Sequence, residues 1–72
     1  MARQAEAEAL LPYEVSYFAR LVRDVRETRG WTQAQLAQAA TMPLQAVIDF
    51  EAGRIRPALA KNTMRHLIDA MD

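Results

Sequence analysis

The stretch that decides the fold is residues 30–37, which read GWTQAQLA. Within it, Thr32 and Gln35 match a capping box. In this motif the threonine hydroxyl accepts a hydrogen bond from the backbone amide three residues later, and the glutamine side chain accepts one from the threonine amide. Gly30 is expected to end a preceding helix, because glycine commonly occupies the position that follows a helix. The stretch therefore predicts the end of one helix and the start of a short second helix that ends near Ala40.

A longer helix is expected before Gly30. From Tyr13 onward, apolar residues recur at helical spacing. They are Val15, Phe18, Leu21, Val22 and Val25. The first dozen residues are rich in Ala and Glu and carry almost no apolar stripe, so the chain is expected to consist of an N-terminal arm, residues 1–12, and one helical domain, residues 13–72.

Two further helices are expected after the short one. Pro43 fits the first position of a helix, where its missing N–H costs nothing, and Val47 and Phe50 form an inward stripe before Gly53. After a loop of residues 54–57, a last helix is expected to run to the end of the sequence. Its inward stripe consists of Met64, Leu67, Ile68 and Met71. The fold class is therefore predicted to be all-α, a compact bundle of four or five helices, and part of the last stripe is expected to stay exposed in a monomer as a dimer seam.

Composition limits the class of protein. The 72 residues are 51% hydrophobic and 25% charged, which corresponds to one small globular domain. The chain has no cysteine for disulfides or a thiolate zinc site, and small domains of this kind often gain stability by forming oligomers. No run approaches the roughly 18 apolar residues of a membrane span, and the first residues do not resemble a signal peptide. No membrane contact and a cytoplasmic location are therefore expected.

No residue pattern indicates catalysis. His66 lies off the apolar stripe of the last helix and has no second ligand at a metal-binding spacing, so it is expected to be a surface residue. Asp69 and Asp72 are three residues apart but have no base or pocket beside them. The sequence therefore predicts no enzyme, no metal site and no cofactor.

Two short helices joined by a three- to four-residue turn have the geometry of a helix-turn-helix. The residues that add a family resemblance are Arg26, 30–37, Val47, 50–53 and Arg56-Pro57. Together they resemble the XRE family of phage-repressor-like regulators over residues 19–71, and residues 25–33 are locally similar to HipB-type antitoxins. This resemblance implies a lambda-repressor-like domain that binds double-stranded operator DNA as a homodimer. It also implies that Arg26 and Glu51 form a structural ion pair.

The same resemblance assigns residues to DNA binding. The positions that match the family's base-reading residues are Leu44, Gln45, Ala46, Ile48 and Asp49. Among them only Gln45 has typical chemistry, because its amide can pair with N6 and N7 of adenine. The expected phosphate-binding residues are Thr32, Gln33, Arg54 and Arg56. The first two lie at the start of the second helix, where free backbone amides bind a phosphate oxygen.

Bulk charge is less favourable to DNA binding, since nine basic residues balance nine acidic ones and the isoelectric point is near 6.6. The favoured function is still a sequence-specific transcriptional regulator that acts as a repressor. A narrower version is the antitoxin of a toxin-antitoxin operon, which represses its own promoter and binds a toxin protein through the arm. The alternative is a protein-interaction module on the same fold, in which Leu44, Ala46 and Ile48 form an apolar ridge for another chain.

Overall fold

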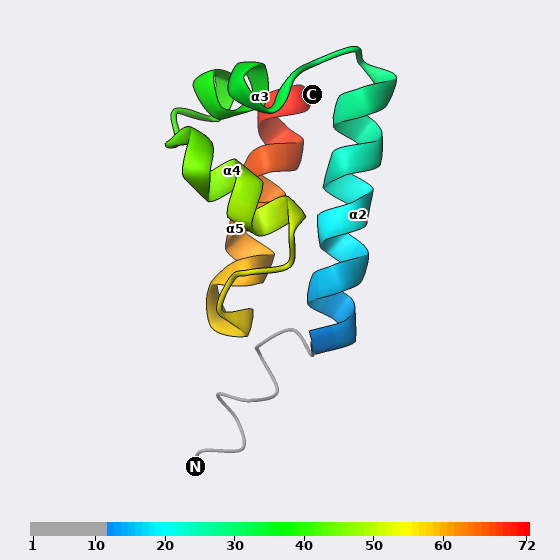
Figure 1. Ribbon diagram of the computed structural model, residues 1–72, viewed down its shortest axis with the longest axis vertical. Helices are drawn as coiled ribbons and strands as arrows, with labels where there is room; N and C mark the ends of the chain where they lie inside the picture. Colours follow the sequence, from blue (N-terminus) through cyan, green and yellow to red (C-terminus); the bar gives the residue numbers. More distant parts are fainter. Residues whose placement is uncertain (1–11) are drawn as a thin grey trace.

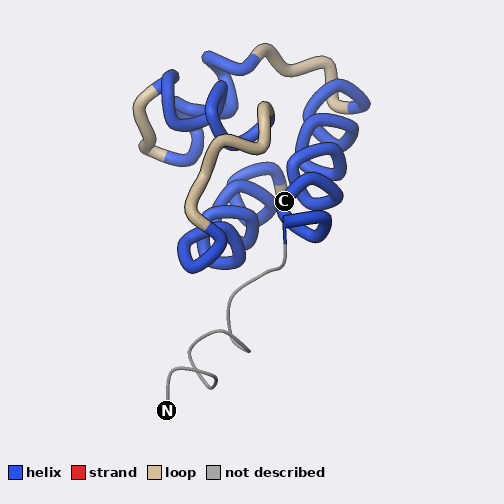
Figure 2. Tube along the Cα trace, turned by 60° about the horizontal axis from the view of Figure 1, so that its bottom comes forward, coloured by secondary structure: helices blue, strands red, loops and turns tan. Residues whose placement is uncertain are grey.

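The computed structural model describes residues 12–72, which form four α-helices and no strand (Figure 1). The helices are α2 (Pro12–Thr28), α3 (Gln33–Ala40), α4 (Leu44–Glu51) and α5 (Pro57–Met71). Short loops join them (Figure 2). Within this range the all-α prediction is confirmed, with four helices. The expected arm, residues 1–12, lies outside the described residues except for Pro12.

Proline starts two of the helices, as its chemistry allows. Pro12 opens α2 one residue before the apolar pattern begins, and Pro57 opens α5. Both residues lack an N–H that would have no partner inside the helix. The prediction that Pro43 is the first residue of its helix is wrong by one position. Pro43 is the N-cap, with φ −62° and ψ 144°, and α4 begins at Leu44. The proline ring fixes φ at a value that is found both in helices and in extended chain. The value of ψ decides between the two, and at Pro43 it is that of extended chain.

Three of the helices, α2, α3 and α4, are followed by a residue with a positive φ. Gly30 and Gly53 have φ of 74° and 76°, which is the left-handed conformation that glycine adopts without a steric cost. Both are the glycines that the sequence predicts as helix ends. Thr41 also has a positive φ, 55°, and its amide donates to the Gln38 carbonyl at 3.2 Å. This threonine closes α3, and the turn to α4 is only residues 41–43.

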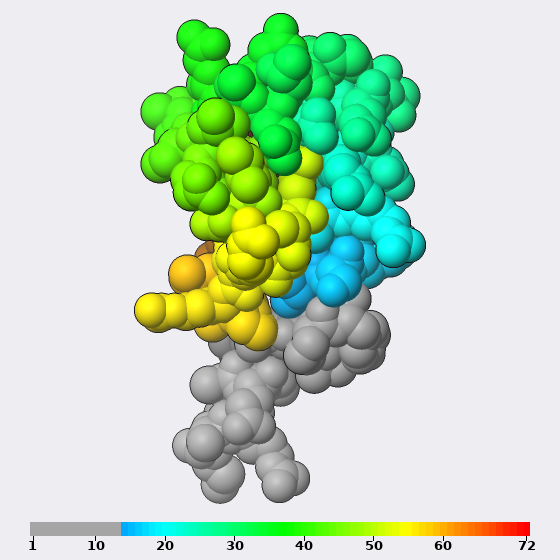
Figure 3. Space-filling view, in the orientation of Figure 1, coloured from blue at the N-terminus to red at the C-terminus, as the bar shows by residue number. Residues whose placement is uncertain are grey.

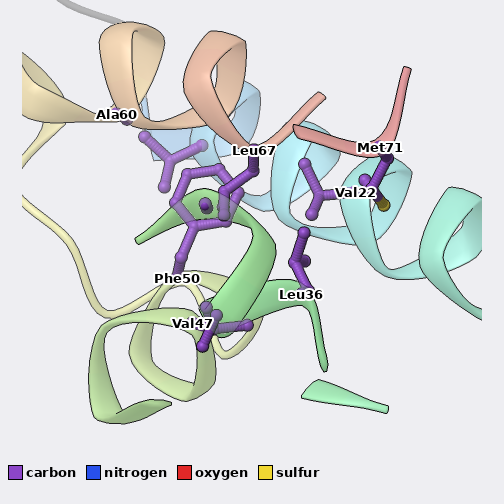
Figure 4. Close-up of a cluster of buried hydrophobic side chains, with 10 residues drawn as sticks. Val22, Leu36, Val47, Phe50, Ala60, Leu67 and Met71 are labelled. Atoms are coloured by element: carbon purple, nitrogen blue, oxygen red, sulfur yellow. The ribbon is translucent and has the colours of Figure 1, made fainter. Parts of the chain in front are cut away.

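All four helices contribute to one core, because α2 packs against α4 and α5, and α3 packs against the same two helices. The largest fully buried side chains are Phe50, Leu36, Leu67, Met71, Val22 and Val47 (Figure 4). In the apolar stripe of α5, Leu67 and Met71 belong to this core, since they are 0% and 2% exposed. Only Met64 and Ile68 of that stripe are half-buried. Packing of α5 against both α2 and α3 covers the rest of the stripe within one chain.

Candidate nucleic-acid interface

The helices α3 and α4 form the helix-turn-helix pair. The side chains of Val47 and Phe50 are completely buried and fix one face of α4 against the core. The first turn of α4 faces solvent, where Leu44 is 45% exposed and Gln45 is also exposed. In the view of Figure 3, α4 and the turn that follows it lie at the surface of the molecule. This arrangement leaves one edge of α4 open to a ligand.

The structure brings Arg26 and Glu51 into a bidentate ion pair between α2 and α4. Nε of Arg26 donates to Oε2 of Glu51 at 2.7 Å, and Nη2 donates to Oε1 at 3.0 Å. The third nitrogen, Nη1, donates to the carbonyl of Trp31 at 2.8 Å. The two side chains are only 10% and 3% exposed. Hydrogen bonding to Glu51 raises the pKa of Arg26 above its ordinary value, so the guanidinium is charged at neutral pH.

Gln33 joins this pair as a third member, which the sequence analysis missed. Its Nε2 donates to Oε1 of Glu51 at 3.1 Å. The Arg26–Glu51–Gln33 cluster therefore ties α2, the start of α3 and the end of α4 together. Gln33 was expected to bind phosphate, and the second hydrogen of its Nε2 is left to donate to a phosphate oxygen.

The start of α3 carries the predicted capping box. Oγ1 of Thr32 accepts from the Gln35 amide at 3.1 Å, and the Thr32 amide donates to Oε1 of Gln35 at 2.7 Å. The Leu36 amide donates to the Thr32 carbonyl. The amides of Gln33 and Ala34 have no acceptor inside the helix, because the helix begins there. These two amides and the Thr32 hydroxyl hydrogen are the donors at this terminus.

Asp49 holds two of the predicted DNA-contacting side chains. Its Oδ1 accepts from Nε2 of Gln45 at 2.9 Å and from Nη2 of Arg54 at 3.2 Å. The Arg54 amide also donates to the Asp49 carbonyl at 2.8 Å. The predicted base reader and a predicted phosphate contact therefore share one carboxylate, at the surface beside the end of α4.

The remaining residues that were predicted to contact DNA differ in how far they are exposed. Leu44 stands out on the first turn of α4, whereas Ala46 and Ile48 are half-buried. Arg56 is exposed at the N-cap of α5, and its carbonyl accepts from the Leu59 amide. Of the supposed apolar ridge, only Leu44 is prominently exposed.

The pKa of Asp49 lies below its ordinary value of 3.8, chiefly because Gln45 donates to the carboxylate and secondarily because Arg54 does. We expect Gln45→Ala and Arg54→Ala each to raise this pKa toward 3.8, because each removes a hydrogen bond to the carboxylate. The depressed pKa means that the network contributes above pH 3.8 and is lost as the pH falls through the folded-state pKa. Carbon-detected NMR titration of the Asp49 carboxyl between pH 2 and 6 measures this. A pKa that stays unchanged in Gln45→Ala would contradict the hydrogen bond between Gln45 and Asp49.

His66 was expected to be a surface residue, and the residue is exposed, but its ring is engaged. Nε2 lies 2.6 Å from the Ala40 carbonyl and donates to it. Ala40 ends α3, where carbonyls lack partners within the helix. The contact fixes the helix-turn-helix turn to α5, and no local pattern indicated it, since the two residues are 26 apart in sequence.

Within residues 12–72, no group of three or more acidic or histidine side chains is placed to hold a metal ion. None of the four helices is long and apolar enough to cross a membrane.

The packing of α3 against α4, the three-residue turn and the exposed first turn of α4 define a small DNA-binding domain of the helix-turn-helix class. A family model described as a helix-turn-helix domain matches residues 17–71, so the chain belongs to this family. The match is consistent with the XRE resemblance and does not confirm the likeness to HipB-type antitoxins. Comparisons with curated proteins and with solved structures found no match.

Proposed function

We propose that the protein is a sequence-specific regulator of transcription that places α4 in the major groove of DNA. The observation that carries this proposal is the position of α4. Its inner face is fixed by Val47 and Phe50, while its first turn, which follows the three-residue turn from α3, remains exposed. A groove about 12 Å wide admits one such helix.

Base reading is assigned to the open edge of α4. The amide of Gln45 offers Oε1 and one free hydrogen to adenine, since its other hydrogen is held by Asp49. Leu44 contacts a thymine methyl, and the half-buried Ala46 and Ile48 add apolar surface beside it. Asp49 acts in this scheme mainly by orienting Gln45. A good bidentate contact discriminates by about 1–3 kcal/mol.

Phosphate binding is assigned to the two ends of the helix-turn-helix. The Thr32 hydroxyl and the Gln33 side chain, together with the first amides of α3, face one phosphate. Arg54 and Arg56 serve a second position after α4. Because Arg54 already pairs with Asp49, it offers DNA a partly neutralised charge, which fits a modest dependence of affinity on salt.

Repression by a two-fold dimer is the regulatory mode we propose. A dimer can meet two half-sites about 34–36 Å apart with the same helix. The half-buried Met64 and Ile68 are the apolar side chains that α5 offers to a second copy. The antitoxin role stays a prediction, because its candidate toxin contact is the arm.

The test uses duplexes selected from a random library and compares Gln45→Ala with Arg54→Ala. Gln45→Ala should relax preference at one base pair, because it removes contacts to a base edge. Arg54→Ala should weaken all sequences about equally, because it removes a cation from the backbone contact and leaves Asp49 without its ion-pair partner.

Filter retention of labelled duplex at two salt concentrations measures both effects, and palindromic duplexes compared with single half-sites report dimer binding. Unchanged sequence preference in Gln45→Ala would contradict the orientation of α4. No site-specific retention of the wild-type protein at micromolar concentration would reject the DNA-binding function.

A protein-interaction module is the second candidate, and one observation favours it. Gln45 and Arg54, the two side chains best suited to DNA, are both hydrogen-bonded to Asp49, while the exposed Leu44 lies on the same helix turn as Gln45. Under this alternative, Leu44→Ser weakens binding to a partner protein and has no effect on DNA. The retention experiment separates the two functions.

A further inference from the structure

A surface hollow of about 160 Å³ lies between α2 and the C-terminal end of α4. Its walls include Ser16, Arg20 and Arg23 from α2, with Glu51 and Gly53 from the end of α4. The two segments meet in Figure 3, where the blue and cyan part of α2 borders the yellow turn. The positive φ of Gly53 brings this turn close to α2, so that a Cβ there would lie 3.9 Å from Oγ of Ser16.

The hollow presents two unneutralised cations. Arg20 and Arg23 are three residues apart on α2, so they share a face of the helix, and both are exposed. The arginines that form ion pairs within residues 12–72 are Arg26 and Arg54. The carboxylate of Glu51 is 3% exposed and already accepts from its neighbours in the cluster. The hollow therefore favours an anion.

Its position connects the two predicted phosphate contacts. Glu51 at one wall accepts from Gln33 at the start of α3, and Gly53 at another wall directly precedes Arg54. An anion in the hollow thus lies next to the surface assigned to DNA. The volume also exceeds the roughly 30 Å³ that one water occupies in the liquid, so a tetrahedral anion can enter.

We infer that this hollow binds a phosphate group of the DNA backbone through Arg20 and Arg23. The guanidinium fork matches phosphate oxygens bidentately. The helix α2, which lies outside the helix-turn-helix, thereby adds a third phosphate contact to each half-site. It also supplies positive charge on the DNA-binding side of a chain whose formal net charge is zero. This inference rests on the proposed function.

The experiment compares two double variants that remove the same charge. Arg20→Gln with Arg23→Gln empties the hollow of cations. Lys61→Gln with Arg65→Gln is the matched control, because both residues are exposed on α5 and do not line the hollow. Circular dichroism checks that both variants keep the fold, as expected for exposed side chains.

Affinity for the selected duplex and for a random duplex is measured at several salt concentrations. The slope of log affinity against log salt should fall in magnitude by about 0.9 for each phosphate group that the protein no longer neutralises. The Arg20/Arg23 variant should show this decrease once per subunit and should bind both duplexes more weakly by the same factor. The control should keep the wild-type slope. An unchanged slope in the Arg20/Arg23 variant, or an equal change in the control, would overturn the inference while the DNA-binding function stands.

A second measurement separates the inference from the proposed function. NMR signals of the arginine Nε–H groups are followed in the wild-type protein during titration with inorganic phosphate at low salt. Selective shifts of Arg20 and Arg23 support the site. If the protein retains no duplex but these shifts occur, DNA is the wrong source and the hollow takes a free phosphate group. Neither retention nor shifts would overturn both proposals.

Discussion

Replacing Glu51 with alanine is expected to destabilise the domain by about 3–5 kcal/mol, because the change leaves the guanidinium of Arg26 buried without its counter-charge. The guanidinium is 10% exposed, and two of its three hydrogen bonds end on Glu51. The amide of Gln33 loses its acceptor as well. A domain of roughly 60 ordered residues has a total stability of about 3–9 kcal/mol, so the variant should be largely unfolded or close to it.

Urea unfolding followed by circular dichroism measures this effect. The double variant Arg26→Met with Glu51→Leu is the informative partner, because apolar groups of similar size leave no unpaired buried charge. It should be more stable than either single change. Losses that simply add, with a coupling below about 0.5 kcal/mol, would show that the pair does not act as a unit.

Phe50→Ala should cost about 3–5 kcal/mol, the usual range for removing a buried aromatic ring. Phe50 is completely buried between the helices, and Figure 4 shows its ring beside Leu67 and Ala60. Because α4 is only eight residues long, and short isolated helices are marginal in water, its position depends on this anchor. Loss of the ring should also abolish DNA retention.

Leu59→Ala is the matched control for this change, since Leu59 is a large apolar residue that is 52% exposed. Its substitution should change the stability by less than about 0.5 kcal/mol. Thermal and urea denaturation measure the free energy of unfolding of both variants. A Phe50→Ala protein that keeps wild-type stability would contradict the core described here.

The helices were largely predictable because their signals are local. Glycine conformation ended α2 and α4, and the capping box of Thr32 and Gln35 started α3. Apolar spacing predicted which residues of α2 and α4 turn inward, since a helix repeats its faces every three to four residues whatever it packs against. Pro43 was misplaced by one position because its fixed φ fits both the cap and the first helical residue.

The candidate site was predictable only in part. The resemblance indicated which positions lie on α4 and at the start of α3, and the contact of Gln45 with Asp49 follows from their spacing of four residues on one helix. The contact of Arg54 with Asp49 depends on the path of the chain after the end of α4, which the sequence pattern did not predict. The exposure of the base-reading positions was not predicted correctly either. Ala46 and Ile48 were assigned to the same surface as Leu44, but they are half-buried.

The sequence by itself determined where the helices begin and end to within one or two residues, which residues form most of the core, and that the chain is a helix-turn-helix domain. Apart from the Arg26–Glu51 pair, which the family resemblance implied, only the tertiary structure decided which polar side chains meet across helices. Gln33 reaches Glu51 over 18 residues, His66 reaches Ala40 over 26, and Arg20 and Arg23 come to border Gly53. The physical reason is that backbone preferences act over a few residues. Contacts between distant residues depend instead on the angles and distances at which whole helices pack.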